Sequence, residues 1–163
     1  MYRIAVITVS DRGALGDRPD ESGPAVREMV GELGEVIVYK VLPDDLDVLK
    51  ETMVDLADRG KVDLILTTGG TGLSPRDNTP EATLAVIDRE VPGLAEAMRL
   101  ESMKKTNRAM LSRAVAGIRH RTLIVNLPGS VKAVRECLGV ILPALPHGLE
   151  ILTGRGGECG SRD

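Results

Sequence analysis

Short apolar runs alternate with amphipathic helical stretches along this chain, and that alternation limits the folds it can adopt. The runs have the length and β-branched composition of strands, and most are separated by stretches with apolar residues at three- and four-residue spacing. Strands that alternate with helices pair in parallel through right-handed crossovers, with helices on both sheet faces. We therefore expect an α/β fold, three-layer α/β/α, with a mostly parallel central sheet. The predicted strands are 2–9, 35–42, 64–66, 115–118 and 122–127, and the predicted helices are 24–33, 46–56, 80–88, 94–105 and 131–142.

Two local patterns refine this expectation near the C-terminal end. The strands 115–118 and 122–127 flank a short polar segment and predict a hairpin. Ser130 is expected to cap the last helix, because its hydroxyl can accept a bond from a free N–H group of the first turn. Pro143 and Pro146 should then kink or interrupt that helix.

Length and composition indicate one globular domain. The chain has 163 residues, of which 42% are apolar and 28% charged, and we expect residues 1–153 to form the domain. Residues 154–163 are rich in glycine and charge and are expected to be a disordered tail. The two cysteines show no disulfide framework and the two histidines no metal-ligand spacing, which argues against a zinc site.

The charge and the aromatic content exclude some classes of partner. The net charge is −3 and Tyr2 and Tyr39 are the only aromatic residues, so neither a basic surface nor base stacking favours nucleic acid binding. No basic segment with a cleavage site precedes the first strand, and no run is expected to reach the length of a membrane span. We expect a cytoplasmic protein that does not bind membranes.

The most distinctive motif is a glycine loop between a strand and a helix. Gly69, Gly70, Thr71 and Gly72 follow the apolar run 64–66. Glycines let backbone N–H groups converge on an anion without interference from a Cβ atom. No lysine follows as in a P-loop, and the spacing does not match a dinucleotide fingerprint. The motif therefore predicts a phosphate site of another kind, with a plain turn as the alternative.

The residues after the glycine loop support that interpretation. Arg76 and Asp77 place a cation beside an anion, and Thr79, Pro80 and Glu81 have the pattern of a helix start. Threonine is a good N-cap, proline suits the first helical position, and an acid complements the helix dipole. A helix N-terminus carries partial positive charge and adds to an anion site.

Polar residues follow four of the predicted strands. They are Ser10-Asp11, Pro43-Asp44, the loop 68–77, and Pro128-Gly129-Ser130. In open α/β sheets, ligands bind outside the carboxyl ends of the strands. We expect these four segments to converge on one crevice.

Each charged candidate has a structural alternative. Asp44 could cap the second helix or bind hydrated Mg²⁺, which prefers one or two carboxylates. Asp77 lies too early to cap the third helix and is the stronger metal candidate, whereas Asp11 could form a turn. Arg76 could be a surface charge or contact phosphate. Lys132 opposes the dipole of the last helix unless an anion shares that terminus, and it could equally be a solvated lysine.

Three motifs resemble the MogA/MoaB family of molybdenum cofactor biosynthesis, which includes related domains in gephyrin. They are SDR after the first strand, TTGGTGLSPRDNTPEAT around the glycine loop, and LPGS followed by KAV. The resemblance covers about residues 3–152. It implies an α/β fold, usually a homotrimer, that binds molybdopterin, a pterin carrying a dithiolene and a phosphate. In the MogA branch it implies adenylylation, in which Mg²⁺-ATP and molybdopterin give adenylyl-molybdopterin and pyrophosphate.

The resemblance also assigns residues. It implies that Asp44 and Asp77 are the catalytic aspartates and hold Mg²⁺. Arg76, Ser130 and Lys132 are added as binding candidates by their positions at the predicted crevice. The binding loops that match the family contain Ser10, Asp11, Gly69, Gly70, Thr71, Gly72, Thr79, Pro80, Glu81, Pro128 and Gly129.

The branch of the family stays open at this stage. The segment from Arg76 to Pro80 resembles MogA, whereas 130–133 and 112–117 resemble MoaB. We expect an adenylyltransferase that uses ATP, molybdopterin and Mg²⁺, with a downstream molybdate-inserting enzyme as a candidate partner. The alternative is a non-catalytic molybdopterin-binding or scaffold protein of the MoaB type, against which the presence of both aspartates argues. A generic sugar- or nucleotide-phosphate binder is disfavoured by the specificity of the motifs.

Overall fold

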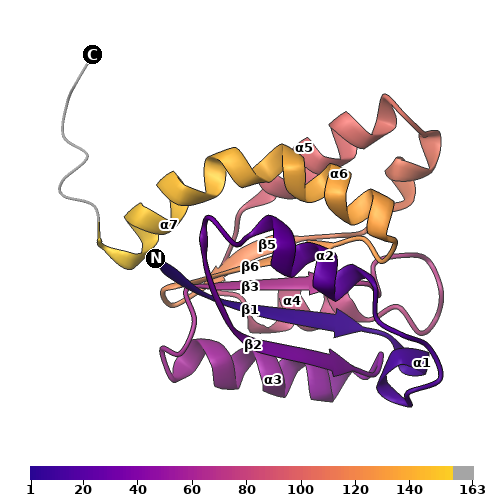
Figure 1. The fold of residues 1–163 in the computed structure, drawn as a ribbon, viewed down its shortest axis with the longest axis horizontal. Coiled ribbons are helices and arrows are strands. Elements are labelled where there is room, and N and C mark those ends of the chain that lie inside the picture. The colour runs from indigo at the N-terminus through magenta and orange to yellow at the C-terminus, as the bar shows by residue number, and fades with distance from the viewer. Residues whose placement is uncertain (156–163) are drawn as a thin grey trace.

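A six-stranded sheet forms the centre of the molecule, and its strands follow the order β2-β1-β3-β6-β5-β4 (Figure 1). The structure is a computed structural model and describes residues 1–155. β2, β1, β3 and β6 pair in parallel, and β5 and β4 continue the sheet antiparallel. The expected mostly parallel sheet and the hairpin are confirmed. The strands are β1 (Tyr2–Val9), β2 (Gly34–Leu42), β3 (Leu64–Thr68), β4 (Arg89–Glu90), β5 (Ala116–Arg119) and β6 (Thr122–Leu127).

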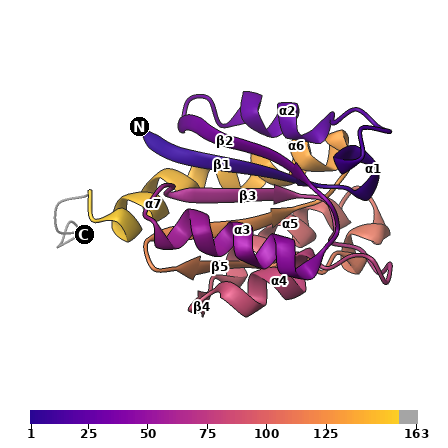
Figure 2. The ribbon, with the colours of Figure 1, turned by 90° about the horizontal axis from the view of Figure 1, so that it is seen from below.

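Helices cover both faces of the sheet, which confirms the three layers. α2, α5, α6 and α7 cover one face, and α3 and α4 cover the other, as the views in Figure 1 and Figure 2 show. The helices are α1 (Asp11–Ala14), α2 (Ser22–Met29), α3 (Leu46–Asp58), α4 (Thr79–Val86), α5 (Pro92–Met103), α6 (Val131–Ile141) and α7 (Leu145–Thr153), with 3₁₀ turns η1 (Asn107–Leu111) and η2 (Leu142–Ala144). The short elements α1, η1 and β4 were not expected from the sequence.

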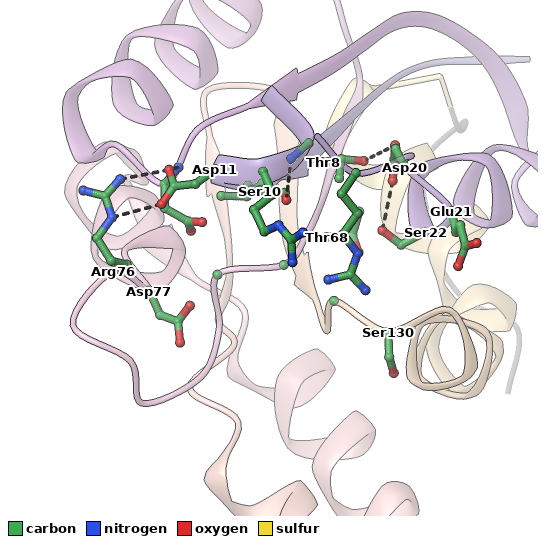
Figure 3. A pocket seen from close by; sticks show the side chains of 18 of the residues that line it. Thr8, Ser10, Asp11, Asp20, Glu21, Ser22, Thr68, Arg76, Asp77 and Ser130 are labelled. Carbon is green, nitrogen blue, oxygen red and sulfur yellow. Dashed lines mark hydrogen bonds and ion pairs between the residues drawn. The ribbon is translucent and has the colours of Figure 1, made fainter. Parts of the chain in front are cut away.

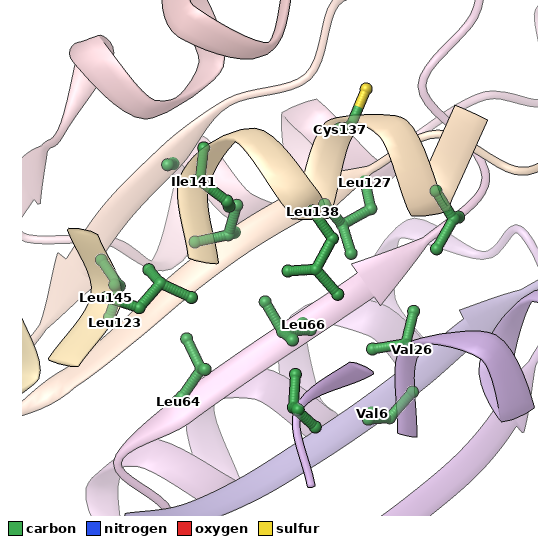
Figure 4. Close-up of a cluster of buried hydrophobic side chains, with 14 of the residues drawn as sticks. Val6, Val26, Leu64, Leu66, Leu123, Leu127, Cys137, Leu138, Ile141 and Leu145 are labelled. Carbon is green, nitrogen blue, oxygen red and sulfur yellow. The ribbon is translucent and has the colours of Figure 1, made fainter. Parts of the chain in front are cut away.

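The core consists of two aliphatic layers separated by the sheet. Successive residues of a strand point to opposite faces, so Ile4 and Val6 of β1 pack towards α6 while Ala5 and Ile7 pack towards α3. Figure 4 shows the first layer, where Leu66 lies opposite Leu138. Strands buried on both faces read as continuous apolar runs, which is why the central strands were recognisable in the sequence.

The last helical stretch differs from one expectation. Val131–Thr153 is long and apolar enough to cross a membrane by length and composition alone, although no run of that length was expected. Within it, Leu138, Ile141, Leu145 and Leu149 are buried in the core, and a single stretch of this kind is weak evidence for a membrane span. Cytoplasmic location stays a prediction. As expected, the prolines interrupt the stretch, because α6 ends at Ile141 and η2 precedes α7.

The helix caps agree with the sequence in one case and correct it in two. The Ser130 hydroxyl accepts a bond from Ala133 N at 3.3 Å, as expected. Asp44 does not cap α3, because Asp45 does so by accepting from Val48 N. Thr79 is the first residue of α4 rather than its cap, and its hydroxyl donates inward to the Gly69 carbonyl.

The chain after α7 is described only in part. Gly154 ends α7 in a left-handed conformation with φ +68°, and Arg155 forms an ion pair with Asp63 at 3.3 Å. These two residues are therefore placed, although disorder was expected from position 154. The predicted disorder of residues 156–163 falls outside the described residues.

A buried asparagine joins the sheet to α4. The Asn126 amide donates to the hydroxyls of Thr67 and Thr83 at 3.0 and 2.9 Å, and its carbonyl accepts from Val115 N at 3.2 Å. Asn126 is fully buried. The Thr83 hydroxyl also donates to the Thr79 carbonyl at 2.9 Å, so the Asn126 amide connects β3, β6 and α4 in one buried network.

We expect Asn126→Leu to lower the free energy of unfolding by about 1–3 kcal/mol, because it leaves buried polar groups without partners. Asn107→Leu, at an exposed site in η1, is the control and should change stability by less than about 0.5 kcal/mol. Denaturant unfolding of both variants measures the difference. Equal stability of the two variants would show that the buried network does not stabilise the fold.

Candidate active site

A cavity of about 860 Å³ opens at the carboxyl ends of the parallel strands. Figure 3 shows its labelled side chains, which come from the ends of β1 and β3 and the segments after them, from the loop before α2 and the first residue of α2, and from the residue before α6. The expected convergence of the four segments on one crevice is confirmed by its lining. The predicted residues that line it are Ser10, Asp11, Asp44, Gly69, Gly70, Arg76, Asp77, Gly129 and Ser130.

Asp11 and Arg76 form a two-bond ion pair across one end of the cavity. Arg76 Nε and Nη2 donate to the Asp11 oxygens at 3.0 and 2.9 Å. Asp11 Oδ1 also accepts from the backbone N–H of Asp44 at 2.9 Å. The Arg76 guanidinium, followed by this N–H group, holds the pKa of Asp11 below its usual value. These bonds connect the loops after β1, β2 and β3, and the Arg76 guanidinium is already paired with a carboxylate of the protein.

Asp44 carries a buried oxygen without a partner. Within residues 1–155, its Oδ1 atom is buried and makes no hydrogen bond. Burial raises the pKa of Asp44, and the charges of Asp11 and Asp77 raise it further. A buried carboxylate oxygen without a donor is costly. This atom is therefore suited to a cation supplied from outside the chain.

Asp77 is held by its own loop beside Asp44. Its Oδ2 atom accepts from Ser74 N at 3.0 Å, and its backbone carbonyl accepts from Arg113 Nη2 at 2.8 Å. Its charge acts on the pKa of Asp44. The two carboxylates thus share one end of the cavity, where their charges repel each other in the absence of a cation.

The glycine loop brings the backbone close to both carboxylates. Gly69 and Gly70 have φ +98° and +68°, a region that favours glycine. A Cβ atom on Gly70 would lie 2.3 Å from the Thr79 hydroxyl and 2.8 Å from Asp44 Oδ1. A Cβ atom on Gly72 would lie 2.8 Å from Asp77 Oδ2. The absence of side chains at these positions therefore makes room for the carboxylates.

Seven of the predicted site residues do not line the cavity. Thr79 and Pro80 are buried behind the glycine loop, and Lys132 is exposed on α6. The Pro128 carbonyl accepts from Thr68 Oγ1 at 2.7 Å. These residues support the cavity or lie away from it. The full set is Thr71, Gly72, Thr79, Pro80, Glu81, Pro128 and Lys132.

Arg113 organises the glycine loop from behind, a role not expected from the sequence. Its backbone N–H donates to the Thr71 carbonyl at 2.9 Å, and its Nε atom donates to the Gly72 carbonyl at 2.7 Å. It also donates to the Asp77 carbonyl and pairs with Glu81. The Arg113 side chain thus connects Gly72 at the end of the glycine loop to Asp77. The motif at 112–117 was noted in the sequence, but its partner loop was not identifiable there.

Asp20 anchors the far end of the cavity and was also missed. Its carboxylate accepts from Thr8 Oγ1 at 2.7 Å, from Gly23 N at 3.1 Å and from the Tyr39 hydroxyl. Burial acts to raise the pKa of Asp20, but these bonds outweigh it and lower the value. Burial and Asp20 together raise the pKa of Tyr39 to about 12. The other lining residues outside the predicted segments include Arg12, Arg18 and Ser22.

The carboxylates fit Mg²⁺ rather than a metal that needs a full protein cage. Within residues 1–155, no group of three or more His, Cys, Asp or Glu side chains could hold a metal ion. Mg²⁺ needs only one or two carboxylates and takes its other ligands from water and phosphate. The orphaned Oδ1 atom of Asp44 and the neighbouring Asp77 meet that requirement.

The chain is similar in sequence to known proteins that are named for molybdopterin. Residues 5–147 match the family described as probable molybdopterin binding domain. The chain is 41% identical over 154 residues to molybdopterin adenylyltransferase of Helicobacter pylori, covering 93% of this chain and 88% of that protein. It is 44% identical over 163 residues to gephyrin of Dictyostelium discoideum, covering 93% of this chain but 23% of gephyrin.

A solved structure has the same fold. The molybdopterin biosynthesis enzyme MoaB from Thermus thermophilus is 54% identical, with a TM-score of 0.90, over 94% of this chain and 98% of that one. The family match spans most of the chain, and the similarity extends over nearly the full length of the bacterial proteins. The chain therefore belongs to the MogA/MoaB family of molybdenum cofactor biosynthesis proteins.

Proposed function

We propose that the protein adenylylates molybdopterin in molybdenum cofactor biosynthesis. A phosphate oxygen of molybdopterin attacks the α-phosphorus of ATP, a new P–O bond forms, and the bond to pyrophosphate breaks. The observation that carries this proposal is Asp44, which lines the cavity together with Asp77 and has one buried oxygen without a hydrogen-bond partner within residues 1–155. The name of the Helicobacter pylori relative supports the same reaction.

In this reaction the protein positions the substrates rather than taking part covalently. Asp44 and Asp77 would hold Mg²⁺, which when bound offsets the negative charge of the phosphate groups. Gly69 and Gly70 line the cavity, and their backbone would form the part of the wall that phosphate approaches. The Asp11–Arg76 pair holds the loops after β1, β2 and β3 in place relative to one another.

The competing function is a molybdopterin-binding or scaffold protein that does not turn over ATP. The presence of both aspartates favours the enzyme. The test is ATP-dependent release of pyrophosphate with molybdopterin and Mg²⁺ present, together with detection of adenylyl-molybdopterin. Tight molybdopterin binding without any pyrophosphate release would favour the binding protein.

We also propose a homotrimer that delivers its product to a molybdate-inserting enzyme. An exposed apolar surface supports self-association, since Leu100, Met103, Met110 and Leu111 all leave large side chains in solvent. Light scattering after gel filtration should give three times the chain mass of 17.4 kDa. A monomeric mass at micromolar concentration would contradict the trimer.

We expect Asp77→Asn to keep the fold, because asparagine retains an oxygen that can accept from Ser74 N. It should lower the rate of pyrophosphate release on the order of a hundredfold or more, since a neutral amide holds Mg²⁺ poorly. Asp47→Asn, which changes an exposed acid on α3, is the control and should be neutral. Near-normal turnover of the Asp77 variant at saturating Mg²⁺ would remove Asp77 from this role.

We expect Asp44→Asn to raise the melting temperature at neutral pH and to abolish pyrophosphate release. Because the pKa of Asp44 is raised in the folded state, its ionised form destabilises the fold above that pKa, and the cost disappears below the ordinary pKa of aspartate. The variant should therefore melt higher than the wild type at neutral pH, with the difference shrinking as pH falls. Activity should be lost.

Thermal melts across pH, with and without Mg²⁺, measure this effect. Mg²⁺ should raise the melting temperature of the wild type and leave that of Asp44→Asn unchanged. A variant that melts lower than the wild type at neutral pH would show that the Asp44 charge is already compensated within the protein.

A further inference from the structure

Two arginines of the cavity form no ion pair with another residue of the described chain 1–155. Arg12, Arg18 and Arg76 line it. Arg76 is engaged by Asp11 through two hydrogen bonds. In the described chain, by contrast, the Arg12 and Arg18 guanidinium groups make no hydrogen bond or ion pair with another protein group. They are the cations of this cavity that are available to a ligand.

The lining of the cavity carries more acidic than basic side chains, so a phosphate ligand needs cations there. Five acidic residues line it against three arginines, so a ligand with several phosphate charges would meet a negative surface. Neither cation suggested by the sequence relieves this, because Arg76 is already paired and Lys132 lies outside the lining. Guanidinium groups bind phosphate oxygens through two parallel donors. The five acids are Asp11, Asp20, Glu21, Asp44 and Asp77.

The loop that carries Arg12 and Arg18 is fixed at both of its ends. At the start, Asp11 is held by Arg76 and by the Asp44 N–H group, and Ser10 caps α1 by accepting from Gly13 N at 3.0 Å. At the end, Asp20 is bonded to β1, to β2 and to the first turn of α2. The two arginines thus extend from a segment whose ends cannot move freely.

We propose that Arg12 and Arg18 together bind the phosphate oxygens of the substrates. This rests on the proposed function for the identity of the phosphate compounds, and it names the groups that neutralise their charge. The nucleotide triphosphate and the molybdopterin phosphate present the same chemistry to an arginine. The test must therefore separate the two sources.

The test compares Arg12→Gln, Arg18→Gln and the double variant by titration calorimetry. The ligands are inorganic pyrophosphate, ATP, AMP and molybdopterin, each with Mg²⁺. We expect each single change to weaken binding of a contacted phosphate about tenfold and the double change to weaken it more. Lysine at either position should restore part of the affinity, because it keeps the charge but loses the two-donor geometry.

Arg121→Gln is the matched control. Arg121 is exposed and lines a separate cavity of about 460 Å³ together with Arg3 and His120, none of which lines the first cavity. Its loss should leave every affinity unchanged. Unfolding of all variants should match the wild type, since neither Arg12 nor Arg18 is bonded through its side chain within the described chain.

The outcomes are distinct. Weaker binding of pyrophosphate and ATP with unchanged molybdopterin affinity would assign the arginines to the triphosphate, and the reverse would assign them to the molybdopterin phosphate. Either result supports the proposal. A double variant that binds all four ligands as the wild type does would overturn it, and adenylylation would stand. If the arginine variants bind pyrophosphate more weakly but the wild type itself forms no adenylyl-molybdopterin, the anion site would stand and the proposed reaction would be refuted.

Discussion

Burial of the central strands on both faces is the constraint on which this structure depends. β1, β3 and β6 have helices above and below them, so most of their side chains are apolar on both faces, and the buried polar ones, such as Asn126, are hydrogen-bonded. Polar groups are therefore displaced to the strand ends, and parallel pairing brings the carboxyl ends to the same edge. The loops at this edge lie outside the two core layers, so they can carry the carboxylates that line the cavity.

The loops at this edge are held by bonds between distant parts of the chain. Arg113 reaches the glycine loop from the segment before β5, and Asp11 joins the loops after β1, β2 and β3. These hydrogen bonds involve backbone carbonyl groups and carboxylates at the strand ends, so they do not replace apolar contacts in the core. They fix the backbone before any ligand arrives, which is the preorganisation that phosphoryl transfer requires.

The buried carboxylate of Asp44 lowers the stability of the fold. This carboxylate is half-buried beside two other acids, so its pKa is raised and one of its oxygens has no donor within the described residues. The glycines around it remove the side chains that could have filled the space. A stable fold would favour a neutral residue at this position, so its presence is best explained by a ligand that brings positive charge.

The sequence by itself determined the order of strands and helices, the mostly parallel sheet and the edge at which the site lies. These follow from local periodicity, from glycine and proline positions, and from the rule that parallel strands end together. The family motifs added Asp44 and Asp77. The short elements α1 and η1 were not predicted, because a single turn has too little periodicity to be recognised.

Only the tertiary structure decided which side chains are free to meet a ligand. Arg76 and Asp11 are 65 positions apart in the sequence, yet they neutralise each other. Thr79 turns inward to Gly69, and Glu81 is taken by Arg113. Arg12 and Arg18 stay available because no partner reaches them within the described chain. Local patterns cannot reveal such pairings, since the choice of partner depends on which loops the packed sheet brings together.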